Sequence, residues 1–284
     1  MNKKVILITG ASAGIGKAAA KMLIENGHVV YTAARRVEKM DDLKTMGGHI
    51  LKMDITSEAS INQGIQQLID EQGTIDVLIN NAGYGSLGAV EEVDLEEVRR
   101  QFEVNVFGSA RLIQLVLPLM RQNKRGRIIN ISSIGAKVYE PMSGWYHSTK
   151  YALEGMSDCL RLELKQFGVD VVLIQPGFIR TEWDQVAHEN LKKFSFEGPY
   201  NSTAIKLINA QSKYLFKYFA SGAERAAKTI IRSVETKNPK PRYVTGKGAR
   251  TFLLARKTFS DRIMDRILLT MLDTFGKADK IPMN

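Results

Sequence analysis

The fold is decided by the stretch Val5-Ile6-Leu7-Ile8-Thr9-Gly10-Ala11-Ser12-Ala13-Gly14-Ile15-Gly16. Its four leading apolar residues predict a buried strand, and the pattern from Gly16 to Asn26 predicts a helix directly after the glycine-rich turn. Glycine permits a positive φ and a close approach of the backbone. The first turn of a helix offers unpaired N–H groups and a positive dipole end. The turn therefore predicts a site for a dinucleotide pyrophosphate, although its spacing, G-x-x-x-G-x-G, differs from the common G-x-G-x-x-G.

The rest of the chain repeats this alternation of strand and helix. Runs rich in β-branched residues predict strands at Val5–Thr9, His28–Ala33, His49–Met53, Val77–Asn80, Arg127–Ser132, Val169–Gln175 and Arg242–Val244. Helical patterns lie between them, for example Ser57–Glu71, Phe107–Arg121 and Tyr146–Phe167. The alternation predicts a single α/β domain over residues 1–284. Its centre is a doubly wound (Rossmann) parallel sheet of about seven strands with helices on both faces.

Composition limits the class of protein. The chain has 284 residues, of which 44% are hydrophobic and 25% charged, as is typical of a globular domain. Cys159 is the only cysteine, so no intrachain disulfide can form, and we expect a reducing, cytoplasmic setting. No uninterrupted apolar run reaches the length of a membrane span, and the run at residues 5–8 is too short for a signal sequence. No metal site is predicted.

The net charge of +10 is concentrated near the C-terminus. Residues 205–284 hold 17 Lys and Arg against 6 Asp and Glu. Such a segment is usually a solvated helical face, which is our prediction, and no nucleic-acid partner is predicted. Residues 259–275 have apolar side chains at helical spacing, so contact with an anionic membrane surface is the alternative.

Further motifs follow the glycine-rich turn. Asn80-Asn81-Ala82-Gly83 comes after the fourth predicted strand, Ser133 after the fifth, and Tyr146-x-x-x-Lys150 thirteen residues later. Pro176-Gly177 ends the sixth strand, with Thr181 just beyond. In this order the motifs resemble those of the short-chain dehydrogenase/reductase (SDR) family over residues 3–183. Two later patterns are similar to its hydroxysteroid-dehydrogenase-like branch, whose substrates vary: Pro241-Arg242-Tyr243-Val244 and Leu253-Leu254-x-Arg256.

The resemblance implies a catalytic centre of Asn105, Ser133, Tyr146 and Lys150. Tyr146 and Lys150 are four apart on a predicted helix and so share a face. A phenol has an ordinary pKa of about 10, and we expect the Lys150 ammonium to lower the pKa of Tyr146 so that it serves as general acid or base. Ser133 would bond the substrate oxygen, while in the family the asparagine helps to hold a water and the lysine holds the nicotinamide ribose. His147 is interpreted as structural, on another face of the helix.

The predicted cofactor is NADP(H). An NAD site needs a carboxylate for the ribose hydroxyls at the end of the second strand, but Ala34 stands there and two arginines, which suit a phosphate, follow. Asp54 resembles the family's adenine contact, with a helix N-cap as the alternative. The predicted cofactor contacts are Gly10, Ser12, Ala13, Gly14, Ile15, Gly16, Arg35, Arg36, Asp54, Ile55, Asn81, Ala82, Gly83, Tyr146, Lys150, Pro176, Gly177, Ile179 and Thr181.

Two segments depart from the alternation. Residues 181–221 are predicted to form a substrate lid, because their many Phe and Tyr side chains suit a bulky apolar substrate. The alternative is that these aromatic residues only pack the lid on its own domain. Ser221-Gly222-Ala223-Glu224 then predicts a capping box for the next helix. Residues 246–284 are predicted to form a basic helical C-terminal extension.

These features predict an NADP(H)-dependent oxidoreductase that interconverts a small-molecule carbonyl and a secondary alcohol. An epimerase of the same fold is disfavoured by the glycine spacing and the Ser–Tyr spacing. A non-catalytic NADP-sensing or interaction protein is disfavoured by the intact set of catalytic residues. Family members pair the helices that correspond to Phe107–Arg121 and Tyr146–Phe167 across a twofold axis. A homodimer is therefore predicted before a homotetramer, on apolar faces that include Leu112, Leu115, Val116 and Leu119.

Overall fold

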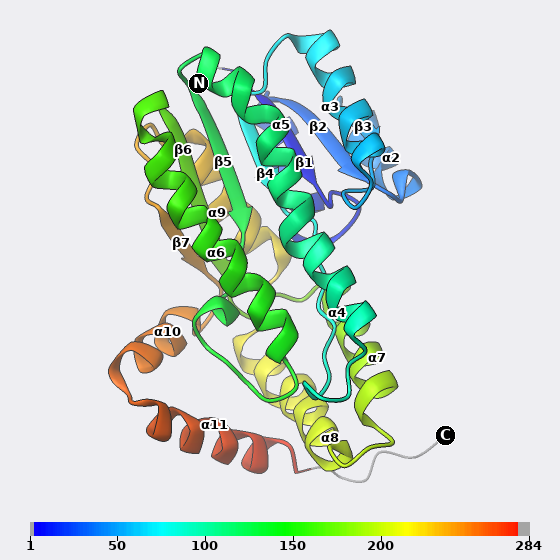
Figure 1. Ribbon diagram of the computed structural model, residues 1–284, viewed down its shortest axis with the longest axis vertical. Helices are drawn as coiled ribbons and strands as arrows, with labels where there is room; N and C mark the ends of the chain where they lie inside the picture. The colour runs from blue at the N-terminus through cyan, green and yellow to red at the C-terminus, as the bar shows by residue number, and fades with distance from the viewer. Residues whose placement is uncertain (1–2, 278–284) are drawn as a thin grey trace.

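The computed structural model describes residues 3–277, and a parallel sheet forms its centre (Figure 1). The strands are β1 (Val5–Thr9), β2 (Val29–Ala34), β3 (His49–Lys52), β4 (Val77–Asn80), β5 (Gly126–Ile131), β6 (Val169–Pro176) and β7 (Arg242–Thr245). They lie in the order β3-β2-β1-β4-β5-β6-β7, and every neighbouring pair is parallel. The predicted doubly wound sheet is confirmed. The strand order reverses between β1 and β4, and ligands bind at the carboxyl ends of strands at such a point.

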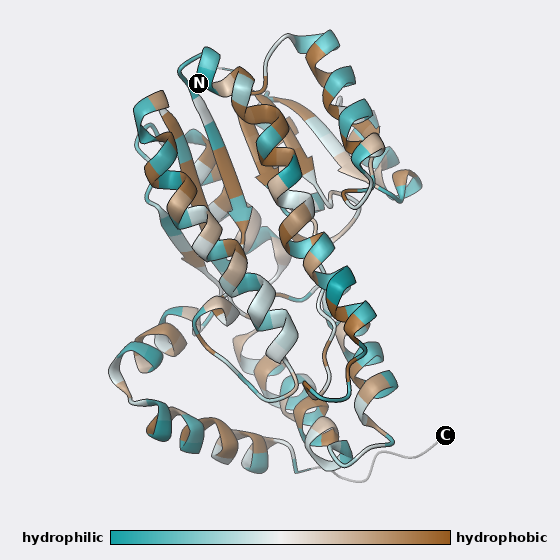
Figure 2. Cartoon of the chain, in the orientation of Figure 1, coloured by the Kyte–Doolittle hydropathy of each residue, from teal (hydrophilic) through white to brown (hydrophobic). Residues whose placement is uncertain are grey.

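Helices cover both faces of the sheet. They are α1 (Gly14–Glu25), α2 (Asp41–Thr45), α3 (Glu58–Gln72), α4 (Leu95–Phe102), α5 (Gly108–Gln122), α6 (Gly144–Leu164), α7 (Trp183–Ser195), α8 (Asn201–Asn209), α9 (Ala223–Glu235), α10 (Ala249–Thr258) and α11 (Asp261–Phe275). Helices α1 and α9 pack together on one face, and α3, α5 and α6 cover the other. Alternate residues of β1 serve the two cores, Ile6 and Ile8 on one side and Leu7 on the other. This explains why the strands are mostly apolar, as Figure 2 shows.

One helix is unusually long. Helix α4, the π-helical turn η2 (Glu103–Phe107) and α5 run together over Leu95–Gln122, which by length and composition alone could cross a membrane. Its apolar side chains include Leu112, Val116 and Met120, which are buried against the sheet. The apolar composition is accounted for by this packing in the core.

Apart from α9 and β7, the C-terminal third forms a helical layer beyond the strand ends, at the bottom of Figure 1. Helices α7 and α8 and the π-helical segment η5 (Ala210–Phe219) occupy the predicted lid, and α11 packs against α8 and η5. Helices α10 and α11 lie in the predicted extension, whose residues 278–284 are outside the described part of the chain.

The predicted capping box is wrong. Gly222 is the N-cap of α9, and no side chain caps that helix. Ser221 instead lies in a bridge with Ile179, and its hydroxyl accepts a hydrogen bond from the N–H of Lys247 (3.1 Å). The extended backbone directs the hydroxyl toward the end of β7 rather than into the helix.

Candidate active site

A cleft of about 800 Å³ opens at the carboxyl ends of the strands. All predicted site residues except Gly16 and Asn105 line it. Beyond Tyr146 the wall is supplied by the helical layer at the bottom of Figure 1, and we call this part the distal half of the cleft. It is lined by Glu140, Trp183, Asp184, Val186, Leu207, Gln211, Leu215, Phe216, Phe252, Leu268, Met271, Leu272 and Phe275.

The glycine-rich turn is held by the loop that follows β4. The side chain of Asn81 donates to the carbonyls of Thr9 (2.9 Å) and Gly10 (3.2 Å), and the Thr9 hydroxyl accepts from the backbone N–H groups of Asn81 and Ala82. A Cβ on Gly16 would lie 2.3 Å from the Asn81 amide nitrogen, so only glycine fits. Gly16 therefore lies behind the turn instead of facing the cleft. Gly10 and Gly14 have positive φ and shape the turn itself.

Cationic side chains flank the end of β2. Ala34 is the last residue of the strand, and Arg35 and Arg36 line the cleft beside it. Arg36 forms an ion pair with Glu182 (3.0 Å), whereas Arg35 has no ion-pair partner among residues 3–277. Glu182 also pairs with Lys39 (3.0 Å). Arg35 is thus the cation at this end of the cleft that is left to meet a phosphate.

Asp54 also lines this end of the cleft. Burial opposes ionisation, but hydrogen bonds from Thr56 and the charge of Arg35 hold the pKa of Asp54 below its ordinary value. The N-cap of α3 is Ser57, which accepts from the N–H of Ser60. The N-cap alternative for Asp54 is therefore wrong.

Helix α6 and the end of β5 bring three predicted catalytic side chains together. Ser133 follows β5, and its hydroxyl accepts a hydrogen bond from the N–H of Gly135 (3.0 Å) and is also hydrogen-bonded to the phenol of Tyr146. The Lys150 ammonium donates to the carbonyl of Ile131 (3.0 Å) and lies 5.9 Å from the centre of the Tyr146 ring. All three side chains face the cleft.

The protonation of Tyr146 differs from the expectation. Burial raises the pKa of Tyr146 to about 12; Ser133 opposes this, while the charges of Glu140 and Asp184 add to it. Burial also lowers the pKa of Lys150 to about 8. The prediction that Lys150 lowers the pKa of Tyr146 is wrong for this state, because loss of water outweighs the ammonium, which is bonded elsewhere. At neutral pH the phenol carries its proton.

Asn105 lies in the π-helical turn η2, behind the cleft wall. Its side-chain amide donates to the carbonyl of Tyr84 (2.9 Å) and the hydroxyl of Thr149 (3.1 Å), and its oxygen accepts from the N–H of Tyr84 (3.0 Å). The amide is therefore occupied by the protein, and it ties the loop after β4 to α6. Turns of π-helix inside α-helices are frequent at functional sites, and this one directs Asn105 inward.

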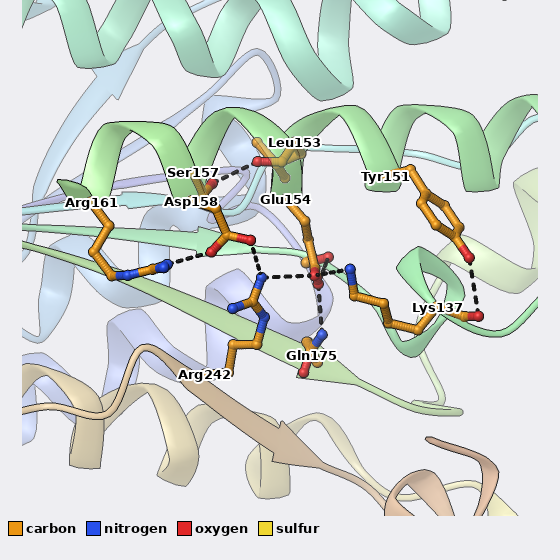
Figure 3. A network of polar contacts seen from close by, with 10 residues as sticks. Lys137, Tyr151, Leu153, Glu154, Ser157, Asp158, Arg161, Gln175 and Arg242 are labelled. Atoms are coloured by element: carbon orange, nitrogen blue, oxygen red, sulfur yellow. Dashed lines mark hydrogen bonds and ion pairs between the residues drawn. The ribbon is translucent and has the colours of Figure 1, made fainter. Parts of the chain in front are cut away.

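A buried carboxylate fixes α6 over the strand ends (Figure 3). Glu154 is 1% exposed. It accepts from the Ser132 hydroxyl (2.9 Å) and the Gln175 amide (2.7 Å), and it forms ion pairs with Lys137 (3.3 Å) and Arg242 (3.4 Å). These partners come from β6, β7 and the two ends of the segment that carries Ser133. Because Lys150 and Tyr146 are one and two turns away on the same face, the Glu154 cluster sets their position.

The model of a protein family described as short chain dehydrogenase matches residues 4–192. The chain belongs to this family. A short-chain dehydrogenase from Streptomyces avermitilis has the same fold over 98% of this chain and 99% of its own, with a TM-score of 0.78 and 30% identity. One from Burkholderia cenocepacia, solved in complex with NADP, covers 94% of this chain and 98% of its own at 24% identity, with a TM-score of 0.75.

Two curated relatives carry names that state an activity. The 3-ketodihydrosphingosine reductase of Bacteroides thetaiotaomicron is 46% identical over 181 residues, 64% of this chain and 66% of its own length. The NADPH-dependent 3-dehydrocapnine reductase of Ornithobacterium rhinotracheale is 34% identical over 275 residues, 92% of this chain and 94% of its own length.

Several residues of this short-chain dehydrogenase site were not predicted from the sequence. Trp183 packs edge-on against Tyr146, with ring centres 5.0 Å apart, and Glu140 and Asp184 line the distal half. His147 also lines the cleft; burial lowers its pKa to about 4 and the ring is neutral. The signal that could have found Asp184 is its place three residues after Thr181, at the start of a helix.

Most aromatic side chains of the predicted lid do not line the cleft, which agrees with the alternative that they pack the lid on its own domain. Within residues 181–221, Phe216 lines the cleft, whereas Tyr214 and Tyr218 contact each other outside it and Tyr214 packs on Phe275. The aromatic wall of the distal half instead includes Phe252 and Phe275, which belong to the predicted extension. The extension therefore forms part of the cleft.

We predict that Glu154→Gln lowers the free energy of unfolding by about 2 kcal/mol, because Lys137 and Arg242 lose the buried charge between them. Urea unfolding measures this. The control is Glu163→Gln, an exposed position on the same helix, for which we expect a change below about 0.5 kcal/mol. Equal stability of the two variants would contradict the role assigned to the Glu154 cluster.

Proposed function

We propose that the chain is an NADP(H)-dependent reductase that converts a ketone on a long apolar substrate to a secondary alcohol. The observation that carries this proposal is the protonated, buried phenol of Tyr146, hydrogen-bonded to the hydroxyl of Ser133. Two neighbouring hydroxyl groups that line a dinucleotide-type cleft suit a carbonyl oxygen that gains negative charge and then a proton.

The cleft fits the proposed cofactor. The turn from Gly10 to Gly14 leaves room for a pyrophosphate at the N-terminus of α1. At the ribose end the acid that NAD requires is replaced by Ala34, and Arg35 stands beside it without an ion-pair partner in the described chain. Asp54, at the same end, is ionised and lines the cleft. These features favour NADP(H) over NAD(H).

Side chains of the protein would supply the proton that the ketone oxygen gains. When bound, NADPH would supply the hydride. Tyr146 would donate its proton to the ketone oxygen, since a pKa near 12 keeps the phenol protonated until the substrate gains charge. Ser133 would hold the same oxygen by a hydrogen bond. Lys150, largely charged at neutral pH, would hold the ribose and replace the proton lost from Tyr146.

The distal half of the cleft supports a long apolar substrate. Its far wall is built from aliphatic and aromatic side chains of η5, α10 and α11, among them Phe216, Phe252, Leu268, Met271 and Phe275. The two relatives named above are called reductases of 3-ketodihydrosphingosine and 3-dehydrocapnine. Both names describe the reduction of a keto group, which agrees with the chemistry proposed for Tyr146.

We predict that Tyr146→Phe lowers ketone-reducing kcat by about a thousandfold while NADPH still binds, because the ring remains but the proton donor is lost. NADPH oxidation in the presence of a long-chain ketone measures turnover, and NADPH fluorescence measures binding. The control is Tyr151→Phe on the same helix, whose hydroxyl bonds the Lys137 carbonyl outside the cleft. More than a tenth of wild-type activity in Tyr146→Phe would refute the mechanism.

A second prediction concerns the cofactor. The wild type should use NADPH in preference to NADH, and the double variant Ala34→Asp/Arg35→Ile should shift the ratio of the two kcat/KM values toward NADH by about a hundredfold. Arg99→Ile removes an arginine from the exposed side of α4 and should leave the ratio unchanged. Equal use of both cofactors by the wild type would contradict the assignment.

We also propose a homodimer built on α5 and α6, which lie on the near face of the sheet in Figure 1. The predicted apolar face is wrong in part, because Leu112 and Val116 are buried against the sheet. The apolar surface that remains comes from Phe107 (50% exposed), Leu115 (37%) and Leu162 (71%). A twofold contact needs only one such patch on each subunit.

Light scattering at micromolar concentration should therefore give a dimer for the wild type and a monomer for Leu115→Asp/Leu162→Asp. Leu254→Asp, at a position on α10 that is 64% exposed, serves as the control and should remain dimeric. A monomeric wild type, or a double variant that stays dimeric, would show that this face is not the interface.

A further inference from the structure

Two carboxyl groups face the distal half of the cleft. Glu140 lies in the loop between Ser133 and α6, and Asp184 lies in the first turn of α7. Both groups are close enough to Tyr146 that their charges act on the phenol. They therefore stand beside the place where the substrate ketone would lie, and the proposed catalytic steps use neither of them.

Neither carboxyl group has a cationic partner among residues 3–277. One oxygen of Glu140, Oε1, accepts from the Ser143 hydroxyl and the Gln211 amide, both at 3.2 Å. Its other oxygen, Oε2, accepts no hydrogen bond from residues 3–277. Asp184 accepts from the backbone of Thr181, and it too forms no ion pair within that part of the chain.

The cationic side chains that line the cleft make contacts with other groups or lie at its other end. Of the basic residues that line the cleft, Arg100 lies over the ring of Tyr84 and beside Glu97, and Lys150 donates to the Ile131 carbonyl. Arg35 lies at the opposite, cofactor end, beyond the glycine-rich turn. The distal half is thus acidic and lacks a compensating charge from the described chain.

Two carboxylates in a partly buried site without a compensating positive charge are unfavourable unless a cation binds beside them. Burial raises the pKa of Glu140 to about 7 and that of Asp184 to about 7, so each group is poised between its charged and neutral forms near neutral pH. A cation bound beside them in the distal half of the cleft would favour their carboxylate forms. The apolar wall beside the two carboxyl groups suits an organic cation, and no group of three or more His, Cys, Asp and Glu side chains in residues 3–277 could hold a metal ion.

We propose that Glu140 and Asp184 bind a primary ammonium group carried by the substrate close to its ketone. The apolar wall formed by Phe216, Phe252 and Phe275 would take the alkyl chain of the same molecule. The substrate class is therefore a long-chain amino ketone, and the product is an amino alcohol. This inference rests on the proposed ketone reduction for its chemistry, but the cation site is defined by the two carboxylates alone.

The first experiment compares matched ketones with NADPH. The probes are 3-ketodihydrosphingosine, a long-chain ketone with an amino group on the adjacent carbon, its N-acetyl derivative, and the ketone with hydrogen in place of the amino group. We expect the wild type to prefer the free amine by about tenfold or more in kcat/KM. Asp184→Asn and Glu140→Gln should each lower that preference about tenfold, mainly through KM, and the double variant should abolish it.

The matched control is Glu189→Gln, an exposed acid further along α7 that lies outside the cleft, and it should keep the preference. The ratio between ketones separates recognition from folding, since a merely structural role would lower both rates together. A wild type that reduces all three ketones equally, or variants that keep the preference, would overturn the amine site while leaving the proposed reductase intact.

A binding experiment keeps the inference testable if no ketone is reduced. Calorimetric titration of the full chain with NADP⁺ present, using dodecylamine and dodecanol below their aggregation concentrations, measures the cation site without turnover. Tighter binding of the amine by about tenfold, lost in Asp184→Asn and in Glu140→Gln, supports the site even where the reductase proposal has failed. Equal affinity for the amine and the alcohol would overturn it.

Discussion

The carboxylate of Glu154 holds the reactive residues in register. A buried charge is stable only when other groups pair with it, and this one is held by Ser132, Gln175, Lys137 and Arg242. These partners belong to neighbouring strands and to the segment after β5, so α6 cannot slide along the sheet without leaving the charge unpaired. The positions of Tyr146, Lys150 and Ser133 relative to one another follow from that single buried interaction.

Loss of water determines how those residues are protonated. Burial raises the pKa of Tyr146, lowers that of Lys150 and lowers that of His147, and it acts on all three because they share one cleft. At neutral pH the result is a neutral imidazole, a phenol that keeps its proton and an ammonium that can replace it. This resting state is prepared to give a proton, which matches the reduction of a ketone more directly than the oxidation of an alcohol.

The sequence predicted what depends on local pattern. Buried strands have continuous apolar sequences, so the sheet could be predicted. The turn at Gly10 to Gly16 lies within one short segment, so the cofactor end of the cleft could be predicted as well. The distal half could not, because Glu140, Asp184 and Phe275 come together from distant segments. Nothing in the local pattern distinguishes Phe275, which lines the cleft, from Tyr218, which does not. The pKa of Tyr146 likewise depends on tertiary burial, which outweighs its helical neighbour Lys150.

Charge is distributed along the cleft so that its two ends favour different partners. Arg35 makes the ribose end cationic, Glu140 and Asp184 make the distal half anionic, and Tyr146 lies between. In the proposed complex an ammonium group would orient the substrate, because only one direction of entry places it on the two carboxylates. The same cation would offset the charges that help to raise the pKa of Tyr146. Recognition of the amine would then ease proton transfer from the phenol, so that a correctly oriented substrate meets a better acid than an empty cleft presents.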